Sequence, residues 1–233
     1  MMNQKVETAK RIGTGLAFFL YPLAALTAFV AHPNLLSLEV GVPVADKVAE
    51  FHNNIFMHFG HLLMVLSVPP LTIVILKFMS MLKGRNAWWG FIGGVLALYG
   101  VLALAVQKTA LCLVMSAFDT LPEAVYATLM PAIEALFNLK GYLALVWLLP
   151  LLPLGVLIQS IGLYRANVIP RWQSVIIMLA MLGMGVSAAV DIDIFGLVST
   201  VILASSWFPL GFQLIKGDLE ISSQTRQQVQ PAL

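Results

Sequence analysis

The chain has 233 residues, of which 60% are hydrophobic and only 10% are charged, and its formal net charge is +2. A soluble domain carries about a quarter charged residues, so this composition excludes an ordinary water-soluble globular protein. The small net charge, without a basic cluster interleaved with aromatic residues, argues against a nucleic-acid-binding protein. A single cysteine, Cys112, excludes an intramolecular disulfide and a CxxC metal or redox motif.

Long apolar runs predict an all-α membrane protein, because each spanning helix needs about 20 apolar residues. Strands are disfavoured, since the runs are continuous and do not alternate with polar residues. We therefore expect a polytopic bundle of six transmembrane helices over residues 12–215. The spans are expected at about residues 12–31, 53–76, 88–117, 141–164, 172–190 and 194–215. A short polar head (1–11) and a flexible polar tail (216–233) complete the chain.

Two regions depart from a simple spanning pattern. Prolines inside the apolar runs should kink the second span and interrupt the fourth; they are Pro69, Pro70, Pro150 and Pro153. In residues 119–138, apolar residues recur at helical spacing against Glu123 and Glu134. This pattern predicts an amphipathic segment on the membrane surface, broken near Pro131. The segment is either a capping helix over the bundle or a docking face for a membrane-protein partner.

Charge differs between the loops on the two sides of the predicted membrane. The head, the loops after the second and fourth spans, and the tail hold ten of the thirteen basic residues. The other side holds eight of the eleven acidic residues and all four histidines. Because basic loops stay in the cytoplasm, we expect both termini to be cytoplasmic and the histidines to lie on the outer side.

The start of the second span carries a polar stripe. At about 100° per residue, its polar side chains fall on one helical face. They are Glu50, Asn54, His58 and His61. Ionisable groups below the membrane interface are costly unless they face a partner or a wet cavity, so such stripes often have a function. Because histidine changes its charge near neutral pH, the stripe would also respond to protons; the alternative is packing, with neutral histidines bonded to neighbouring helices.

The third span repeats this pattern with Lys108, Cys112, Met115 and Asp119 on one face. The ammonium of Lys108 should extend outward or meet an acid. The candidate acids are Glu50, Glu134, Asp191 and Asp193. The last two form a tight outer turn, where they keep the turn in water or share a cation. The predicted ligand or proton pocket, with no catalytic role assigned, consists of Glu50, Asn54, His58, His61, Lys108, Asp191 and Asp193.

The histidines also raise two cofactor hypotheses. His58 and His61, three residues apart on a helix, could both reach one zinc or copper ion, with a further ligand from another helix. A b-type haem needs axial ligands from opposite sides, so His32 or a methionine would have to oppose a histidine of the second span. The sequence has no nucleotide-binding or hydrolase motif.

Three short stretches resemble one family. They are His32-Pro33 at the end of the first span, His61-Leu62-Leu63 in the second, and Val168-Ile169-Pro170-Arg171-Trp172 before the fifth. Together they resemble small six-span bacterial inner-membrane proteins of uncharacterised function, over about residues 12–216. The resemblance implies a six-span fold and a location in a bacterial inner membrane. It supplies no activity and no catalytic residue.

From these patterns we expect a non-catalytic protein that binds or conducts a small ligand or ion through a polar pocket in its outer half. One alternative is a haem- or metal-binding redox subunit of a membrane complex. The other is a structural or assembly subunit that docks through residues 119–138. The expected partners are the lipid bilayer and, through this segment, a membrane protein, with no nucleic acid.

Overall fold

The computed structural model describes residues 2–218, is 84% helical and contains no strand within that range. Among these residues, six helical segments are long and apolar enough to cross a membrane. Their bounds are Gln4–Val30, Ile55–Met81, Gly84–Phe118, Gly141–Ala166, Arg171–Val190 and Asp193–Lys216. The predicted all-α, six-span bundle is confirmed, and the protein is a multi-pass integral membrane protein. Most of the expected tail, residues 219–233, lies outside the described residues.

The first two spans differ in continuity. The first is one long helix, α1 (Met2–Val30), so residues expected as a polar head extend it. The second consists of α3 (Ile55–Leu66) and α4 (Val68–Met81), with an interruption at Ser67. The proline pair after Ser67 occupies the first turn of α4, where a helix has no internal partner for the missing N–H groups. The prolines thus interrupt the span at little energetic cost.

The third span changes its helical form part-way along. A short 3-10 turn, η1 (Gly84–Asn86), precedes α5 (Ala87–Gln107). The π-helical segment η2 (Lys108–Leu113) and α6 (Val114–Phe118) follow. A π-helical segment turns the residues after it to a different face, and such segments are frequent at functional sites. Lys108, the charged residue in the interior of this span, is the first residue of η2.

The last three spans are joined by short links. The fourth begins as the 3-10 helix η3 (Gly141–Leu148) and continues beyond a proline as α8 (Leu151–Ala166). The fifth and sixth are α9 (Arg171–Val190) and α10 (Asp193–Lys216). Asp191, between them, has the left-handed backbone (φ 57°) that commonly ends a helix. The chain therefore reverses direction within about two residues.

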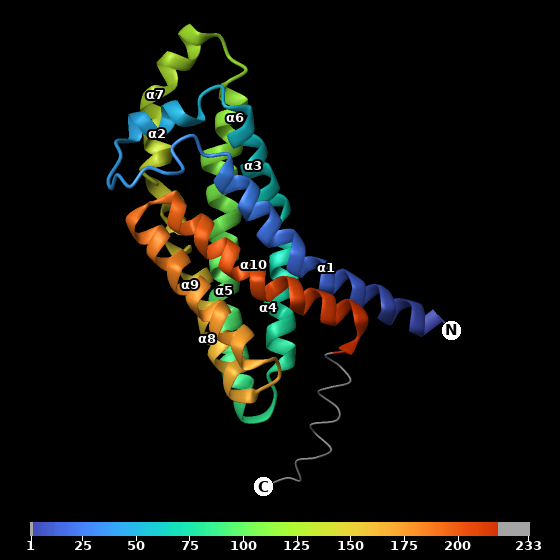
Figure 1. The fold of residues 1–233 in the computed structure, drawn as a ribbon. Helices are drawn as coiled ribbons and strands as arrows, with labels where there is room; N and C mark the ends of the chain where they lie inside the picture. Colours follow the sequence, from blue (N-terminus) through green and yellow to red (C-terminus); the bar gives the residue numbers. More distant parts are fainter. Residues whose placement is uncertain (1, 219–233) are drawn as a thin grey trace, which may run out of the picture.

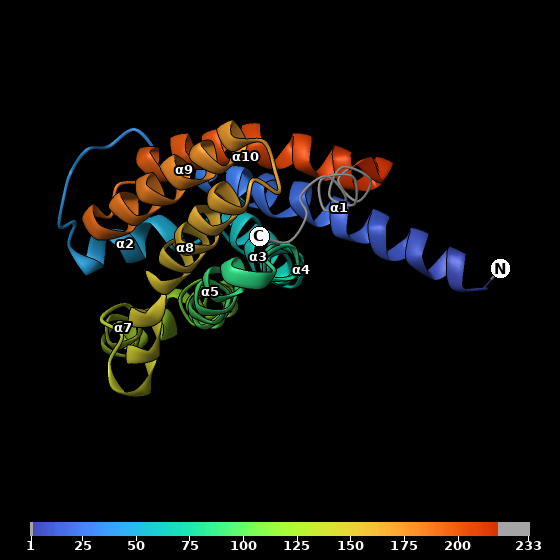
Figure 2. The ribbon, with the colours of Figure 1, turned by 90° about the horizontal axis from the view of Figure 1, so that it is seen from below.

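The spans pack in close pairs, as Figures 1 and 2 show: α1 lies along α10, and α5 lies along α8. Glycines allow the closest approach in the second pair. A Cβ on Gly155 of α8 would lie 2.3 Å from the backbone nitrogen of Ala97 in α5. One on Gly100 would lie 2.2 Å from the backbone nitrogen of Leu152. The two backbones can approach this closely only because side chains are absent there.

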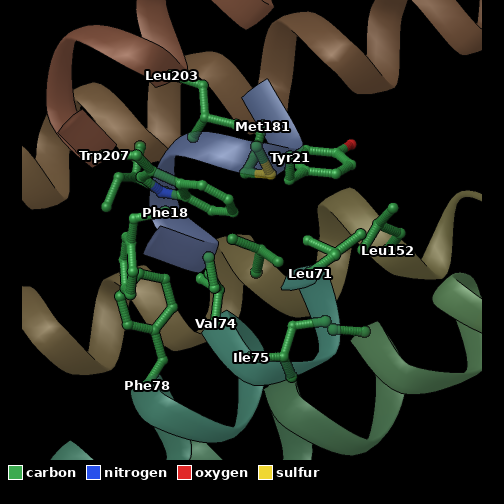
Figure 3. Packing of buried hydrophobic residues seen from close by; sticks show 14 of the residues in the cluster. Phe18, Tyr21, Leu71, Val74, Ile75, Phe78, Leu152, Met181, Leu203 and Trp207 are labelled. Atoms are coloured by element: carbon green, nitrogen blue, oxygen red, sulfur yellow. The ribbon is translucent and has the colours of Figure 1, made fainter. Parts of the chain in front are cut away.

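Large apolar side chains from several helices fill the centre of the bundle (Figure 3). The ring of Phe18 packs edge-on against Phe78 and Trp207, with centroids 5.5 Å apart in both pairs. Gln159 of α8 is fully buried, and its amide donates to the carbonyl of Ile75 in α4 at 3.1 Å. The same amide donates to a carbonyl of α5 at 3.3 Å. These contacts hold α8 against α4 and α5.

Two short helices, α2 (Val44–Phe51) and α7 (Glu123–Phe137), cover one end of the bundle with a second apolar cluster. The break expected near Pro131 is wrong, because α7 continues through it. Tyr126 before the proline and Ile133 after it are buried in the same cluster and hold both halves in place. We call this end, which also carries the α9–α10 turn, the histidine end. The opposite end, with the α4–α5 and α8–α9 links, is the basic end.

Candidate functional site

The carboxylate of Asp119 is the centre of a hydrogen-bonded network at the histidine end. Its Oδ1 atom accepts from His52 Nδ1 at 2.9 Å, and its Oδ2 atom accepts from His58 Nε2 at 2.6 Å. The backbone N–H of Asn53 donates to the same Oδ2 atom at 2.9 Å. The side chain of Asp119 is only 11% exposed, so most of its acceptor capacity is used inside the protein. The network joins the α2–α3 link, α3 and the end of α6.

A break between α2 and α3 brings these groups together. Asn53 has a left-handed backbone (φ 57°), and the side chain of Asn54 caps α3 by accepting from a backbone N–H at 3.2 Å. Glu50 therefore belongs to α2, where its carboxylate accepts from the amide of Asn34 at 2.6 Å. The single helical face predicted for the polar stripe is interrupted here, so Glu50 does not continue it.

Tyr126 of α7 packs against the network on its other side. Its ring lies against the ring of His52, with centroids 4.0 Å apart, and the carboxylate of Glu123 lies 3.4 Å from His52 Nε2. Burial and the nearby carboxylates of Asp119 and Glu123 raise the pKa of the Tyr126 phenol. The phenol therefore stays neutral well above physiological pH. The network links α2, α3, α6 and α7, which is the geometry of a structural anchor for the cap.

His61 turns away from this network. It is 1% exposed, and its Nδ1–H donates to the carbonyl of Met57 at 2.7 Å. Its ring packs against those of His32 and Phe51, with centroids 5.2 Å and 5.4 Å away. His58 and His61 therefore have different partners.

This divergence bears on the cofactor hypotheses. Within the described part of the chain, no group of three or more His, Cys, Asp or Glu residues is arranged to hold a metal ion. Ligation of one ion by both His58 and His61 would require one of the two rings to leave its present partner. Ligation of a haem iron by His32 and His61 would require their rings to move apart.

A cavity of about 210 Å³ lies inside the bundle, between α1, α3, α4, α5, η2, α8, α9 and α10; we call it the ligand cavity. Near the histidine end its wall is polar. The lining residues there are His32, Gln107, Lys108, Ser187, Asp191 and Asp193. Farther in, the wall is apolar and aromatic. Met64 lines it, as do Tyr21, Leu71, Met181 and Trp207, which Figure 3 labels. The ligand cavity thus combines a polar end with an apolar interior.

The two carboxylates at the polar end of the ligand cavity each have a partner among the described residues, whereas Lys108 has none. His32 Nδ1 lies 2.8 Å from Asp193 Oδ2, and Lys47 forms an ion pair with Asp191. Lys108 makes no side-chain hydrogen bond or ion pair with any described residue. An uncompensated ammonium within a membrane span is costly, so this position favours an anionic group from outside the chain.

The structure divides the predicted pocket residues into two groups. Lys108 and the two aspartates near the α9–α10 turn line the ligand cavity, whereas no residue of the polar stripe does. Sequence reasoning assigned neither His52 nor Asp119 to a pocket, although they form the network. A carboxylate at the end of an apolar run requires a partner. At Asp119 this signal would have pointed to the histidines predicted for the same side.

Comparison of the chain with protein-family models, curated proteins and solved structures gives no match. The resemblance to small six-span membrane proteins therefore stays an expectation from the sequence. The function has to be inferred from the chemistry of two polar regions. They are the carboxylate–imidazole network around Asp119 and the ligand cavity, where Lys108 has no partner among the described residues.

Proposed function

We propose that this protein is a non-catalytic membrane protein that binds a small amphipathic anion in the ligand cavity. Lys108 holds the acidic head group, and the apolar part of the ligand extends towards Tyr21 and Trp207. The observation that carries the proposal is the unpaired ammonium of Lys108 at the polar end of a mainly apolar cavity. Such a combination of apolar walls with few polar groups is typical of small-molecule sites.

The volume of the ligand cavity limits what it accepts. Sites for drug-sized ligands occupy about 300–1,000 Å³, whereas this cavity has about 210 Å³. A phospholipid or a long-tailed quinone exceeds that volume. A medium-chain or aromatic carboxylic acid matches both the volume and the charge.

The packing between the ligand cavity and the basic end of the bundle supports binding of a ligand over conduction of an ion. Leu71 and Trp207 are the lining residues of α4 and α10 that lie nearest the basic end. Beyond them, Phe18, Val74 and Phe78 are at most 1% exposed (Figure 3). Conduction of an ion needs polar groups or water along the whole path, and these side chains provide neither.

We also propose an orientation in a bacterial inner membrane, with both termini in the cytoplasm and the histidine end outside. The basic loops support this orientation. The single native cysteine, Cys112, is buried, so introduced cysteines can report on each side. In intact cells a membrane-impermeant maleimide should label Glu39→Cys and spare Arg85→Cys, both at exposed positions. The reverse labelling pattern would overturn the orientation.

Octanoate binding to the purified protein tests the proposed function. The protein is placed in lipid nanodiscs and its tryptophan fluorescence is followed, because Trp207 lines the ligand cavity. We expect a saturable response to octanoate and none to octylammonium, with empty nanodiscs as the blank. Lys108→Gln should weaken octanoate binding about tenfold, which corresponds to about 1.4 kcal/mol.

The matched control is Lys140→Gln, which removes an exposed lysine at the same end of the bundle. It should bind octanoate like the wild type. An equal response to octanoate and octylammonium, or unchanged octanoate binding by Lys108→Gln, contradicts the proposal.

The exposed side of residues 119–138 supports a second proposal, an assembly role. Leu121 and Val125 are 38% and 43% exposed, whereas Tyr126 is buried. A partner that docks there should be lost from the purified complex when Val125→Glu is introduced.

A redox role remains a proposal that rests on the histidines alone. A Soret band, or stoichiometric copper or zinc in the purified protein, would support it. A colourless, metal-free preparation would remove it.

A further inference from the structure

A second cavity, of about 410 Å³, lies at the basic end of the bundle and shares no lining residue with the ligand cavity. Its lining comes from the first turns of α1, from α4 and from the last turn of α10. Gln4, Thr8, Lys10, Arg11, Lys77 and Leu214 are among its residues. Figure 1 shows α10 ending beside α1 in this part of the molecule. We call it the basic cavity.

The basic cavity carries positive charge that the described residues do not neutralise. Lys10 Nζ donates to Glu7 Oε1 at 2.9 Å, in a pair that is 66% exposed on both sides. The side chains of Arg11 and Lys77 have no hydrogen bond or ion pair with any described residue. Glu7 also lines the cavity but is paired with Lys10, so the cations of Arg11 and Lys77 have no remaining acid among the lining residues.

The guanidinium of Arg11 lies against the end of α10. A Cβ on Gly217, the residue that caps α10, would lie 2.7 Å from Arg11 Nη1. Arg11 Nε is buried and has no acceptor among the described residues. Leaving a buried charged donor without an acceptor is unfavourable. An anion with two or more oxygens would satisfy it, because a guanidinium binds such groups through two parallel hydrogen bonds.

The position of the basic cavity along the spans favours a lipid as the source of that anion. Lys77 lies one turn before the end of α4, and Leu214 lies in the last turn of α10. The cavity is therefore at the depth where headgroups meet the hydrocarbon. Ile73 lies one helical turn before Lys77 on the same face of α4 and is 41% exposed, so an acyl chain would lie along it.

We propose that the basic cavity binds the phosphate of an anionic phospholipid. Arg11 donates hydrogen bonds to two phosphate oxygens, and Lys77 contributes a further positive charge. Basic pockets between spanning helices bind lipid headgroups in this way. The basic cavity is independent of the ligand cavity. The lipid site could therefore be correct even if the proposed function is wrong, and the reverse.

Native mass spectrometry of the detergent-purified protein tests the lipid site. The probes are phosphatidylglycerol and phosphatidylcholine, which share a phosphate and acyl chains but differ in net charge. The wild type should retain phosphatidylglycerol about tenfold more than phosphatidylcholine. The double variant Arg11→Gln/Lys77→Gln should lose this preference. The matched control Lys83→Gln/Arg85→Gln, which removes the same charge from the same end but outside the cavity, should keep it.

Thermal unfolding with and without phosphatidylglycerol is the second readout. The lipid should raise the unfolding temperature of the wild type and of the control, but not that of the cavity variant. If the cavity variant does not fold, Arg11→Lys replaces it, because this change keeps the charge but loses the two parallel hydrogen bonds. Equal lipid preference in cavity variant and control overturns the proposal. Displacement of the lipid by millimolar inorganic phosphate overturns it too, since the occupant would then be free phosphate.

Discussion

Two polar regions at the histidine end use the same types of side chain in opposite ways. Around Asp119, the carboxylate accepts from two imidazoles and a backbone N–H, so its charge is fully used inside the protein. At the polar end of the ligand cavity the carboxylates are paired, but the ammonium of Lys108 is not. A carboxylate that accepts several internal hydrogen bonds stabilises a fold, whereas an unpaired charge beside a cavity is available to a ligand.

The largest expected effect comes from breaking the network around Asp119. Asp119→Ala leaves His52, His58 and the N–H of Asn53 without their shared acceptor in a mostly buried site. We expect a loss of about 3 kcal/mol in the free energy of unfolding, in the range for removal of a charged hydrogen-bond partner. The measurement is thermal or denaturant-induced unfolding in mild detergent.

Glu134→Ala is the control, because it removes an exposed carboxylate of α7. It should leave stability unchanged. An Asp119→Ala protein as stable as this control would show that the network does not anchor the cap.

The second effect concerns the unpaired charge. Lys108→Gln should reduce octanoate affinity about tenfold, and it should not lower stability, because the lysine has no partner in the protein to lose. Fluorescence titration and thermal unfolding of the same preparation measure both quantities. A marked fall in stability would mean that Lys108 has a structural role like that of Asp119.

Hydropathy predicted the six spans, since apolar length and composition decide which segments cross a membrane. It could not predict the break at Asn53, which depends on a left-handed backbone and on bonds to Asp119, a residue far away in the chain. That break separated Glu50 from His58. The π-helical segment that begins at Lys108 was also beyond sequence reasoning, because this segment packs against α3, which belongs to another span. The positions of the charged residues along the spans were therefore predicted better than the partners that these residues contact.

A smaller effect is expected from the carboxylate beside His32. Asp193→Asn removes a negative charge from the wall of the ligand cavity, so octanoate should bind several-fold more tightly. Asp46→Asn removes an exposed acid of α2 outside the cavity and should leave affinity unchanged. The same titration measures both variants. Weaker octanoate binding by Asp193→Asn would contradict the proposed binding mode, because it would show that this negative charge does not oppose the ligand.

The smallest effect is a pH dependence at the edge of the network. The pKa of Tyr126 is raised in the folded protein by burial and by two carboxylates. The folded state therefore keeps the phenol proton longer than the unfolded state does. This contribution to stability is complete below about pH 10, the ordinary tyrosine value, and is lost as the pH rises through the folded-state pKa.

Tyr126→Phe should consequently lose less stability than the wild type between pH 8 and pH 10.5, measured by thermal unfolding. Tyr142→Phe is the control, because Tyr142 is fully exposed. It should follow the wild-type pH dependence. Identical behaviour of both variants would place the high-pH loss elsewhere in the molecule.

The most direct test of the difference between the two regions is octanoate titration of Lys108→Gln and Asp119→Ala side by side, below the unfolding temperature of both. We predict that Lys108→Gln binds about tenfold more weakly than the wild type, while Asp119→Ala binds normally despite its lower stability. Loss of binding in Asp119→Ala, with normal binding in Lys108→Gln, would contradict this account. It would mean that the network around Asp119 binds the ligand and that Lys108 does not.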